Sequence, residues 1–309
     1  FPSFSGAWRL SNEKFFREAT GIVNNLKLRA SYGFVGNAGI GNYRTIDRLN
    51  EANVVFNKEN VPAVVLGNMR NDNLTWEKSR QLNIGIDVGF LKDRIEIIAD
   101  VYEKITTDLL YNKSLPATTG YSSAISNIGS VRNRGIEFSI TSWNINNRNF
   151  KWKTTLNYAA NRSLVLNING DRIATWGGRI EEGGPLNQFY GFKRLGTWGI
   201  GEEEEAAKYN KKPGDIKFWD YNNNGMKDGE DNVPLGNGMP KFEANMSNYF
   251  FYKNFDFSFD LQSMYGHSIQ NFGRSMLENR VTYSNSYRSA LYDAWTPEHQ
   301  NTVVAAIRL

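Results

Sequence analysis

Polar and apolar residues alternate with a period of two in several segments of about ten residues. In residues 150–161, for example, Trp152 and Leu156 fall on one side of an extended chain, while lysines, threonines and asparagines fall mainly on the other. A helix would need apolar residues three and four positions apart, and these segments do not supply them. The same alternation recurs in six further segments, so we predict seven strands: 26–34, 83–91, 94–104, 135–143, 150–161, 242–252 and 255–265.

The connections between these strands are of two kinds. Very short turns lie at 92–93, 146–148 and 253–254, whereas the other connections are long, the longest running from 162 to 239. Short turns on one side and long loops on the other are typical of bacterial outer-membrane barrels, whose strands need about ten residues to cross the bilayer. Aromatic residues also gather beside the short turns, as a membrane–water interface favours. We therefore predict an all-β fold, an antiparallel transmembrane β-barrel segment in which 162–239 is a folded extracellular loop region.

Composition narrows the possible functions. The 309 residues include no cysteine and only two histidines, which excludes disulfide scaffolds, cysteine-bound metals and histidine-rich metal centres. The net charge is +4, but the basic residues are scattered singly along the strands, so no nucleic-acid partner is expected. No stretch of 18 apolar residues is present, and no catalytic constellation stands out. We expect a protein that is not an enzyme.

Residues 220–231 have the layout of an EF-hand-type calcium loop. Oxygen-bearing side chains stand at positions 1, 3, 5, 9 and 12, glycine stands at position 6, and position 7 is where such loops use a backbone carbonyl. The predicted structural calcium ligands are Asp220, Asn222, Asn224, Met226, Asp228 and Asp231. Two asparagines in place of aspartate, and aspartate in place of glutamate at position 12, predict weak binding. The alternative is a metal-free turn whose side chains accept hydrogen bonds from backbone amides.

Several short stretches occur in order along the chain: LRASYG at 28–33, NLTWEK at 73–78, NIGSVRNRGIE at 127–137, FYGF at 189–192 and GDIK at 214–217. Together with the 220–231 loop, they resemble the C-terminal barrel region of SusC/RagA-type TonB-dependent transporters. The resemblance implies a bacterial outer-membrane protein with a 22-stranded barrel, an N-terminal plug and a segment engaged by the TonB complex. Seven to ten strands cannot close such a barrel. Residues 1–309 are therefore expected to be a partial barrel domain, with the plug and the remaining strands outside this chain.

The resemblance also implies a function, namely import of oligosaccharides or peptides beneath a SusD-like surface lipoprotein that acts as a lid. The residues expected to contact outer-membrane lipid are Ile84, Ile86, Val88, Phe257, Phe259 and Leu261. Those expected to line the lumen include Asn83, Asp87, Glu137 and Asn157. Loop aromatics that would stack on sugar rings or pack on the lid include Tyr121, Trp176, Phe189 and Tyr190.

Two other functions stay open at this point: a structural or adhesive barrel without active transport, and a soluble β-rich carbohydrate-binding module. A plug and a TonB-engaging segment in the same polypeptide would eliminate the first. Membrane fractionation would test the second.

Overall fold

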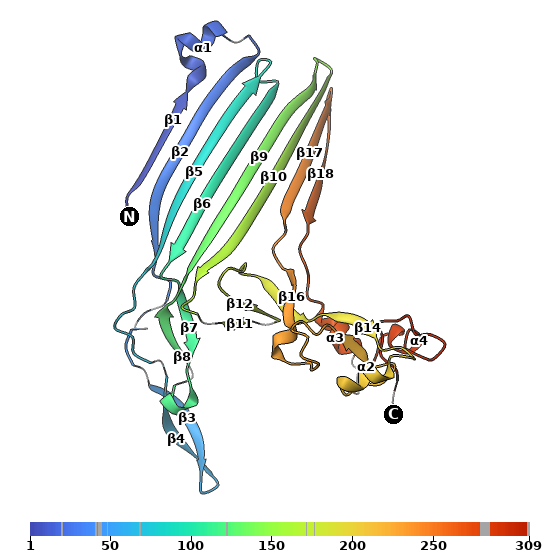
Figure 1. The fold of residues 1–309 in the computed structure, drawn as a ribbon. Helices are drawn as coiled ribbons and strands as arrows, with labels where there is room; N and C mark the ends of the chain where they lie inside the picture. The colour runs from blue at the N-terminus through green and yellow to red at the C-terminus, as the bar shows by residue number, and fades with distance from the viewer. Residues whose placement is uncertain are drawn as a thin grey trace. The chain divides into compact units, whose positions relative to one another are not determined.

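Strands dominate the fold. The computed structural model describes residues 1–309 apart from 20, 41, 43–44, 48, 68, 122, 171, 176, 279–284 and 308–309, and of 17–19 only the backbone. Among these described residues, eight long strands form one antiparallel sheet (Figure 1). In sheet order they are β1 (Ser3–Arg9), β2 (Val23–Asn37), β5 (Glu77–Phe90), β6 (Ile95–Thr107), β9 (Ser130–Asn146), β10 (Phe150–Asn167), β17 (Phe242–Tyr252) and β18 (Phe255–Tyr265). All seven predicted strands are confirmed, and β1 is an addition.

The three short turns lie together at one end of the sheet (Figure 1). Leu91, Lys92 and Asp93 all have positive φ, between 53° and 62°, which lets the chain reverse within three residues. The side-chain oxygen of Asn24 accepts a hydrogen bond from the Lys92 amide at 3.0 Å. Arg94 then donates to the carbonyls of Trp143 and Asn144. These contacts fix the turns to neighbouring strands.

Strand register separates two faces of the sheet. One cross-strand row runs from Leu26 to Leu261 over seven strands and is wholly apolar, through Val88, Ile97, Ile140, Leu156 and Met246. The neighbouring row points to the other side because side chains alternate along a strand. Its members are Lys27, Asp87, Ile98, Ser139, Asn157, Asn245 and Gln262. We call these sides the apolar face and the polar face.

The apolar face is not covered by a second layer of the described residues. Large side chains in the middle of the sheet remain exposed, with Val101 50%, Ile136 48% and Leu261 55% exposed. A soluble β-sandwich would bury such a face against a partner sheet. In the first unit, the buried apolar side chains instead lie where β9 begins and β10 ends: Ile128, Val131, Val165 and Ile168.

One polar cluster interrupts the apolar face near the short turns. The Asn248 side chain, 4% exposed, accepts hydrogen bonds from the Trp152 indole at 3.0 Å and from the Thr154 hydroxyl at 2.7 Å. Thr154 in turn accepts from the Asn144 amide at 2.7 Å. The rings of Trp152 and Phe250 stack beside the cluster with centroids 5.5 Å apart. The Trp152 indole, the Thr154 hydroxyl and the Asn248 side-chain oxygen therefore all have partners, as an apolar environment requires.

The chain divides into two compact units. The first holds the long sheet and comprises 1–172, 181–186 and 240–266. It also contains the hairpins β3 (Leu49–Phe56) with β4 (Glu59–Leu66) and β7 (Leu110–Ser114) with β8 (Ser123–Asn127), at the end opposite the short turns (Figure 1). Three side-chain hydrogen bonds join the segment between β4 and β5 to β8. Asn71 donates to the Ile125 carbonyl, and the Asn127 side chain accepts from the Thr75 amide and donates to the Thr75 carbonyl.

The second unit comprises 173–180, 187–239 and 267–309. Its strands are β11 (Ile173–Thr175), β12 (Gly178–Ile180), β13 (Gln188–Phe192), β14 (Arg194–Thr197), β15 (Ile216–Phe218) and β16 (Asn232–Asn237). The described helices of the chain are short, namely α1 (Lys14–Ala19), α2 (Glu203–Lys208), α3 (Phe272–Glu278) and α4 (Ser289–Tyr292). Within the described residues, none is long and apolar enough to span a membrane. Residues 267–309 thus share a unit with most of the predicted 162–239 region.

Candidate functional site

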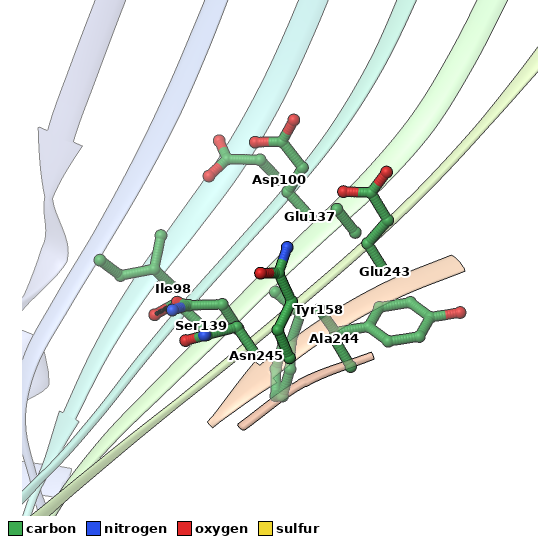
Figure 2. A pocket seen from close by; sticks show the side chains of 12 residues that line it. Ile98, Asp100, Glu137, Ser139, Tyr158, Glu243, Ala244 and Asn245 are labelled. Atoms are coloured by element: carbon green, nitrogen blue, oxygen red, sulfur yellow. Dashed lines mark hydrogen bonds between the residues drawn. The ribbon is translucent and has the colours of Figure 1, made fainter. Parts of the chain in front are cut away.

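The polar face carries a band of carboxylates. Asp100 on β6, Glu137 on β9 and Glu243 on β17 share one cross-strand row, with Ala159 of β10 between the last two. Figure 2 shows the three carboxylates projecting from the same side of the sheet. They border a hollow of about 300 Å³ that is also lined by Ser139, Asn157, Asn245 and Gln262. The hollow therefore presents acids and neutral hydrogen-bonding groups together.

Some of the acids on this face are neutralised by neighbours. Arg29 donates from Nε to Asp87 at 2.9 Å and from Nη2 to Asp100 at 2.8 Å. Lys27 Nζ lies 3.4 Å from the Asp87 carboxylate. Gly85 leaves room for this arrangement, because a Cβ there would displace the Asp100 carboxylate and the Arg29 guanidinium from their present positions. The result is a charged network that links β2, β5 and β6.

Glu137 and Glu243 differ from those paired acids. Both are exposed, and within the described part of the chain neither carboxylate takes part in a hydrogen bond or an ion pair. Their charge therefore acts on whatever occupies the space in front of the polar face, and it favours cationic groups there.

Register supports the assignment of residues to faces. Asn83, Asp87, Glu137 and Asn157, expected to line the lumen, all lie on the polar face. The six residues expected to contact lipid all lie on the apolar face: Ile84, Ile86, Val88, Phe257, Phe259 and Leu261. Sequence reasoning did not single out Asp100 and Glu243 of the carboxylate band. Both nevertheless lie in predicted strands, on the side that became the polar face.

The 220–231 loop winds around the carboxylate of Asp220. That carboxylate accepts hydrogen bonds from the Gly225 amide at 2.8 Å, the Asn224 amide at 3.2 Å and the Tyr209 hydroxyl at 2.9 Å. Desolvation alone would raise the pKa of Asp220, but the bonds from Gly225, Tyr209 and Asn224 outweigh it and hold the pKa below its ordinary value. Gly225 has φ +79°, the left-handed conformation expected of the glycine in the sharp turn.

The other predicted ligands of the loop are also close to backbone amides. Asn222 accepts from the Asn224 amide, and Asn224 accepts from the Met226 amide. Asp228 accepts from the Glu230 amide. Asp231 is 1% exposed and accepts from the amides of Tyr221 and Asp228. Within the described residues, no group of three His, Cys, Asp or Glu side chains is arranged to hold a metal.

The fit to calcium is thus partial. The backbone has the winding and the glycine that the loop type needs, but the carboxylates do not converge on one point where a cation would lie. Each carboxylate oxygen can accept more than one contact, so these hydrogen bonds do not by themselves prevent a cation from sharing the oxygens.

The candidate loop aromatics belong to different parts of the chain. Tyr121 lies in the first unit, and Phe189 and Tyr190 are half-buried neighbours on β13 in the second. The Tyr190 ring lies 3.8 Å from the guanidinium of Arg179. Trp176 lies outside the described residues.

A second aromatic cluster, which the sequence did not signal, adjoins the 220–231 loop. Lys227 Nζ lies 3.7 Å from the ring centre of Phe192 and 4.7 Å from that of Phe218. These contacts hold the loop lysine over the rings as a cation–π pair.

Comparison with known proteins gives consistent results. The family model described as "TonB dependent receptor-like, beta-barrel" matches residues 1–224. A TonB-dependent receptor of Formosa agariphila, P26, is 34% identical over 97% of this chain and 31% of its own length. The TonB-dependent receptor SusC of Bacteroides thetaiotaomicron is 29% identical over 93% of this chain and 29% of its own length. The chain spans about a third of the length of the curated relatives it matches.

Solved structures share the fold. The structure of the RagAB peptide transporter superposes with a TM-score of 0.81 over 99% of this chain and 34% of that one, at 21% identity. The RagAB peptide importer in the "open-open" state gives the same TM-score at 22% identity.

Long antiparallel strands with one exposed apolar face and one charged face form the wall of a transmembrane β-barrel, the class that this fold defines. The chain belongs to the TonB-dependent receptor-like β-barrel family. It is accordingly part of a bacterial outer-membrane protein, in a family of receptors rather than of enzymes.

Proposed function

We propose that the protein containing this chain imports oligosaccharides or peptides across the outer membrane, powered through TonB and assisted by a SusD-like lipoprotein lid. The observation that carries the proposal is the division of the eight-stranded sheet into an apolar and a polar face. That division supports a lipid-embedded wall around a hydrated interior. The likeness to receptors such as SusC supports coupling to TonB, and the fold of a peptide transporter supports a cargo larger than a single sugar or amino acid.

In this mechanism the long connections and the lipoprotein capture ligand at the outer mouth. Movement of a plug, pulled from the periplasmic side, then opens the lumen. The polar face forms part of the lumen wall, with Asn83 and Asn157 offering amide hydrogen bonds and Glu137 offering an unpaired negative charge.

The orientation is testable by cysteine labelling, because this chain contains no cysteine and any cysteine elsewhere in the full-length protein can first be replaced with serine. Full-length protein carrying Asn60→Cys, in the β3–β4 hairpin, should react with a membrane-impermeant maleimide on intact cells. Asn147→Cys, in a short turn, should react only after the outer membrane is opened. The reverse pattern would place the long connections in the periplasm.

Uptake in the source bacterium tests the function itself. A strain lacking the gene, complemented with the full-length protein, should regain accumulation of a fluorescent oligosaccharide pool or a fluorescent peptide pool. A complementing protein without its TonB-engaging segment should restore neither. Equal uptake by both proteins would contradict active transport. If the strain lacking the gene attached less well to surfaces but kept its normal uptake, the adhesive barrel would be favoured.

We also propose that the 220–231 loop holds a structural calcium ion. The left-handed Gly225 and the winding of the backbone around Asp220 support this proposal. The role would be to tighten the loop rather than to react, since the predicted ligands are all oxygens of the protein.

A further inference from the structure

Four arginines lie together on the apolar face, toward the end of the sheet that bears the long connections. Arg134 on β9 and Arg162 on β10 are directly opposite each other in a row that also contains Glu103. Arg132 and Arg80 belong to the next row, on either side of Ile105. We call Arg80, Arg132, Arg134 and Arg162 the arginine patch.

The arginine patch has an excess of positive charge. Arg134 is paired with Glu103, which leaves a net charge of +3 from four arginines and one glutamate. Among the described residues, no side-chain hydrogen bond or ion pair involves Arg80, Arg132 or Arg162. Like charges directly opposite each other on neighbouring strands are destabilising. An anion between the guanidinium groups of Arg134 and Arg162 would therefore reduce their mutual repulsion and stabilise the sheet at this place.

The arginine patch lies at the level expected for lipid headgroups. Just below it, the row containing Val101 and Ile136 is aliphatic. Aromatic rings lie in or next to these rows. Tyr32 and Phe34, in contact at 5.3 Å, belong to the two rows of the arginine patch, and Phe242, which stacks on Tyr265 at 5.3 Å, lies one row nearer the short turns. Such rings gather at membrane interfaces.

The distance from the arginine patch to the short-turn end of the sheet also agrees with a position at the membrane interface. Ten residues of β10 separate Trp152, beside the short turns, from Arg162. At about 3.3 Å per residue, and with the 35–45° tilt of barrel strands, they span roughly 23–27 Å of membrane. This is about the height of the apolar band of such barrels.

We propose that the arginine patch binds the phosphate groups of an outer-leaflet glycolipid. Guanidinium groups match phosphate oxygens with two parallel hydrogen bonds, and several of them around one headgroup form a lipid site rather than a diffuse charge. The inference rests on the proposed orientation, in which the long connections face outward. It does not rest on transport.

Binding of diphosphoryl lipid A to the purified full-length protein in detergent tests the proposal. Lipid-bound and lipid-free protein are counted by native mass spectrometry over a titration. The variant Arg132→Gln with Arg162→Gln should bind roughly 25-fold more weakly, at about fivefold for each arginine near a charged headgroup. Arg132→Lys with Arg162→Lys should bind with intermediate affinity, because lysine keeps the charge but cannot donate two parallel hydrogen bonds to a phosphate as a guanidinium does.

The matched control removes two positive charges from the other face of the same sheet. Lys104→Gln with Lys151→Gln changes two exposed lysines on the polar face and should leave the affinity for lipid A unchanged. Dephosphorylated lipid A should bind the parent protein as weakly as diphosphoryl lipid A binds the double glutamine variant.

Three results would overturn the proposal: equal affinity of the parent and the double glutamine variant, equal loss in the lysine control, or displacement of lipid A by millimolar inorganic phosphate. The last would indicate a site for free phosphate. Normal lipid binding together with absent uptake would overturn the transport role alone. Folding of each variant is checked by heat-modifiable migration in gels.

Discussion

At the scale of residues, Asp220 organises the 220–231 loop by accepting hydrogen bonds from two backbone amides and the Tyr209 hydroxyl. The alternation of aspartate, asparagine and glycine predicted a turn at this place. The same residues fit two outcomes, a calcium loop and a turn held by its own amides, because oxygen atoms that bind calcium also accept N–H groups. The pattern alone therefore does not decide between them.

Calcium titration separates the two outcomes. For a site with a dissociation constant of about 10⁻⁴–10⁻³ M, 10 mM calcium should stabilise the folded protein by about 1.4–2.7 kcal/mol. We expect a rise in the melting temperature of chelator-treated full-length protein, and no rise in Asp228→Ala. Glu230→Gln, which removes a neighbouring carboxylate at a position that is not a predicted ligand, should respond as the parent does. No response in the parent would leave only the metal-free turn.

Asn248 is the residue whose role the sequence concealed. Thr154 falls on the apolar side of its predicted strand, and nothing in the alternation shows that a hydrogen-bonding partner stands opposite on β17. The strand register brings the two residues together, because Thr154 and Asn248 are direct cross-strand neighbours. Pairing between strands almost a hundred positions apart is not encoded in either segment alone.

Replacing Asn248 with alanine should lower the free energy of unfolding by about 1–3 kcal/mol, since the Trp152 indole and the Thr154 hydroxyl lose their acceptor in an apolar setting. Adding Thr154→Val to Asn248→Ala should cost less than the sum of the two single changes. Unfolding by denaturant in lipid vesicles measures all three variants. Strict additivity would show that the hydrogen bond does not contribute.

At the scale of elements, the period of two predicted seven of the eight strands of the long sheet. It missed β1, where Phe4, Gly6 and Trp8 are the only positions on the apolar face between Ser3 and Arg9. Three such positions, one of them glycine, form too short a pattern to stand out. The strands β7, β8 and β11 to β15 were missed for a related reason, since strands of three to five residues carry no clear alternation. The strands β3 and β4 have eight residues each, but apolar and polar residues do not alternate along them.

The apolar face gives a graded prediction. On β18, Leu261 is midway between Phe257 and Tyr265, whose rings belong to the two aromatic levels. Leu261→Arg should therefore cost about 2–4 kcal/mol, and Phe259→Arg, one alternate position nearer the short turns, should cost less. Gln262→Arg on the polar face should be nearly neutral. Parent-like assembly and stability of Leu261→Arg would contradict the lipid-facing assignment.

At the scale of the whole molecule, the long connection 162–239 does not form a unit by itself. Most of 162–239 shares its unit with 267–309, a segment without alternation that gave no sign of joining it. Contacts such as the Ala306 amide donating to the Gly214 carbonyl at 2.8 Å join positions almost a hundred residues apart. Such contacts depend on the tertiary fold, whereas the strands follow from local pattern.

The second unit also bears on the proposed lipoprotein partner. It exposes large apolar side chains, among them Trp219 and Tyr221, whose rings meet edge to face at 5.3 Å. Exposed aromatic pairs of this kind are frequent anchors of protein interfaces. A permanent lid should bury more than roughly 2,000 Å² in total, so the complex should survive mild detergent.

We therefore expect a lipoprotein to co-purify with the full-length protein in a 1:1 ratio, and Trp219→Ser with Tyr221→Ser to reduce its recovery at least tenfold under a salt and detergent wash. Phe15→Ser provides the control, because Phe15 is an exposed aromatic in the connection between β1 and β2 at the short-turn end, which the proposed orientation places on the other side of the membrane from the proposed lid. Quantitative mass spectrometry of the purified complex measures the ratio. A parent protein purified without any stoichiometric partner would contradict the lid. Unchanged recovery in the Trp219 and Tyr221 variant would instead mean that the lid docks on another surface.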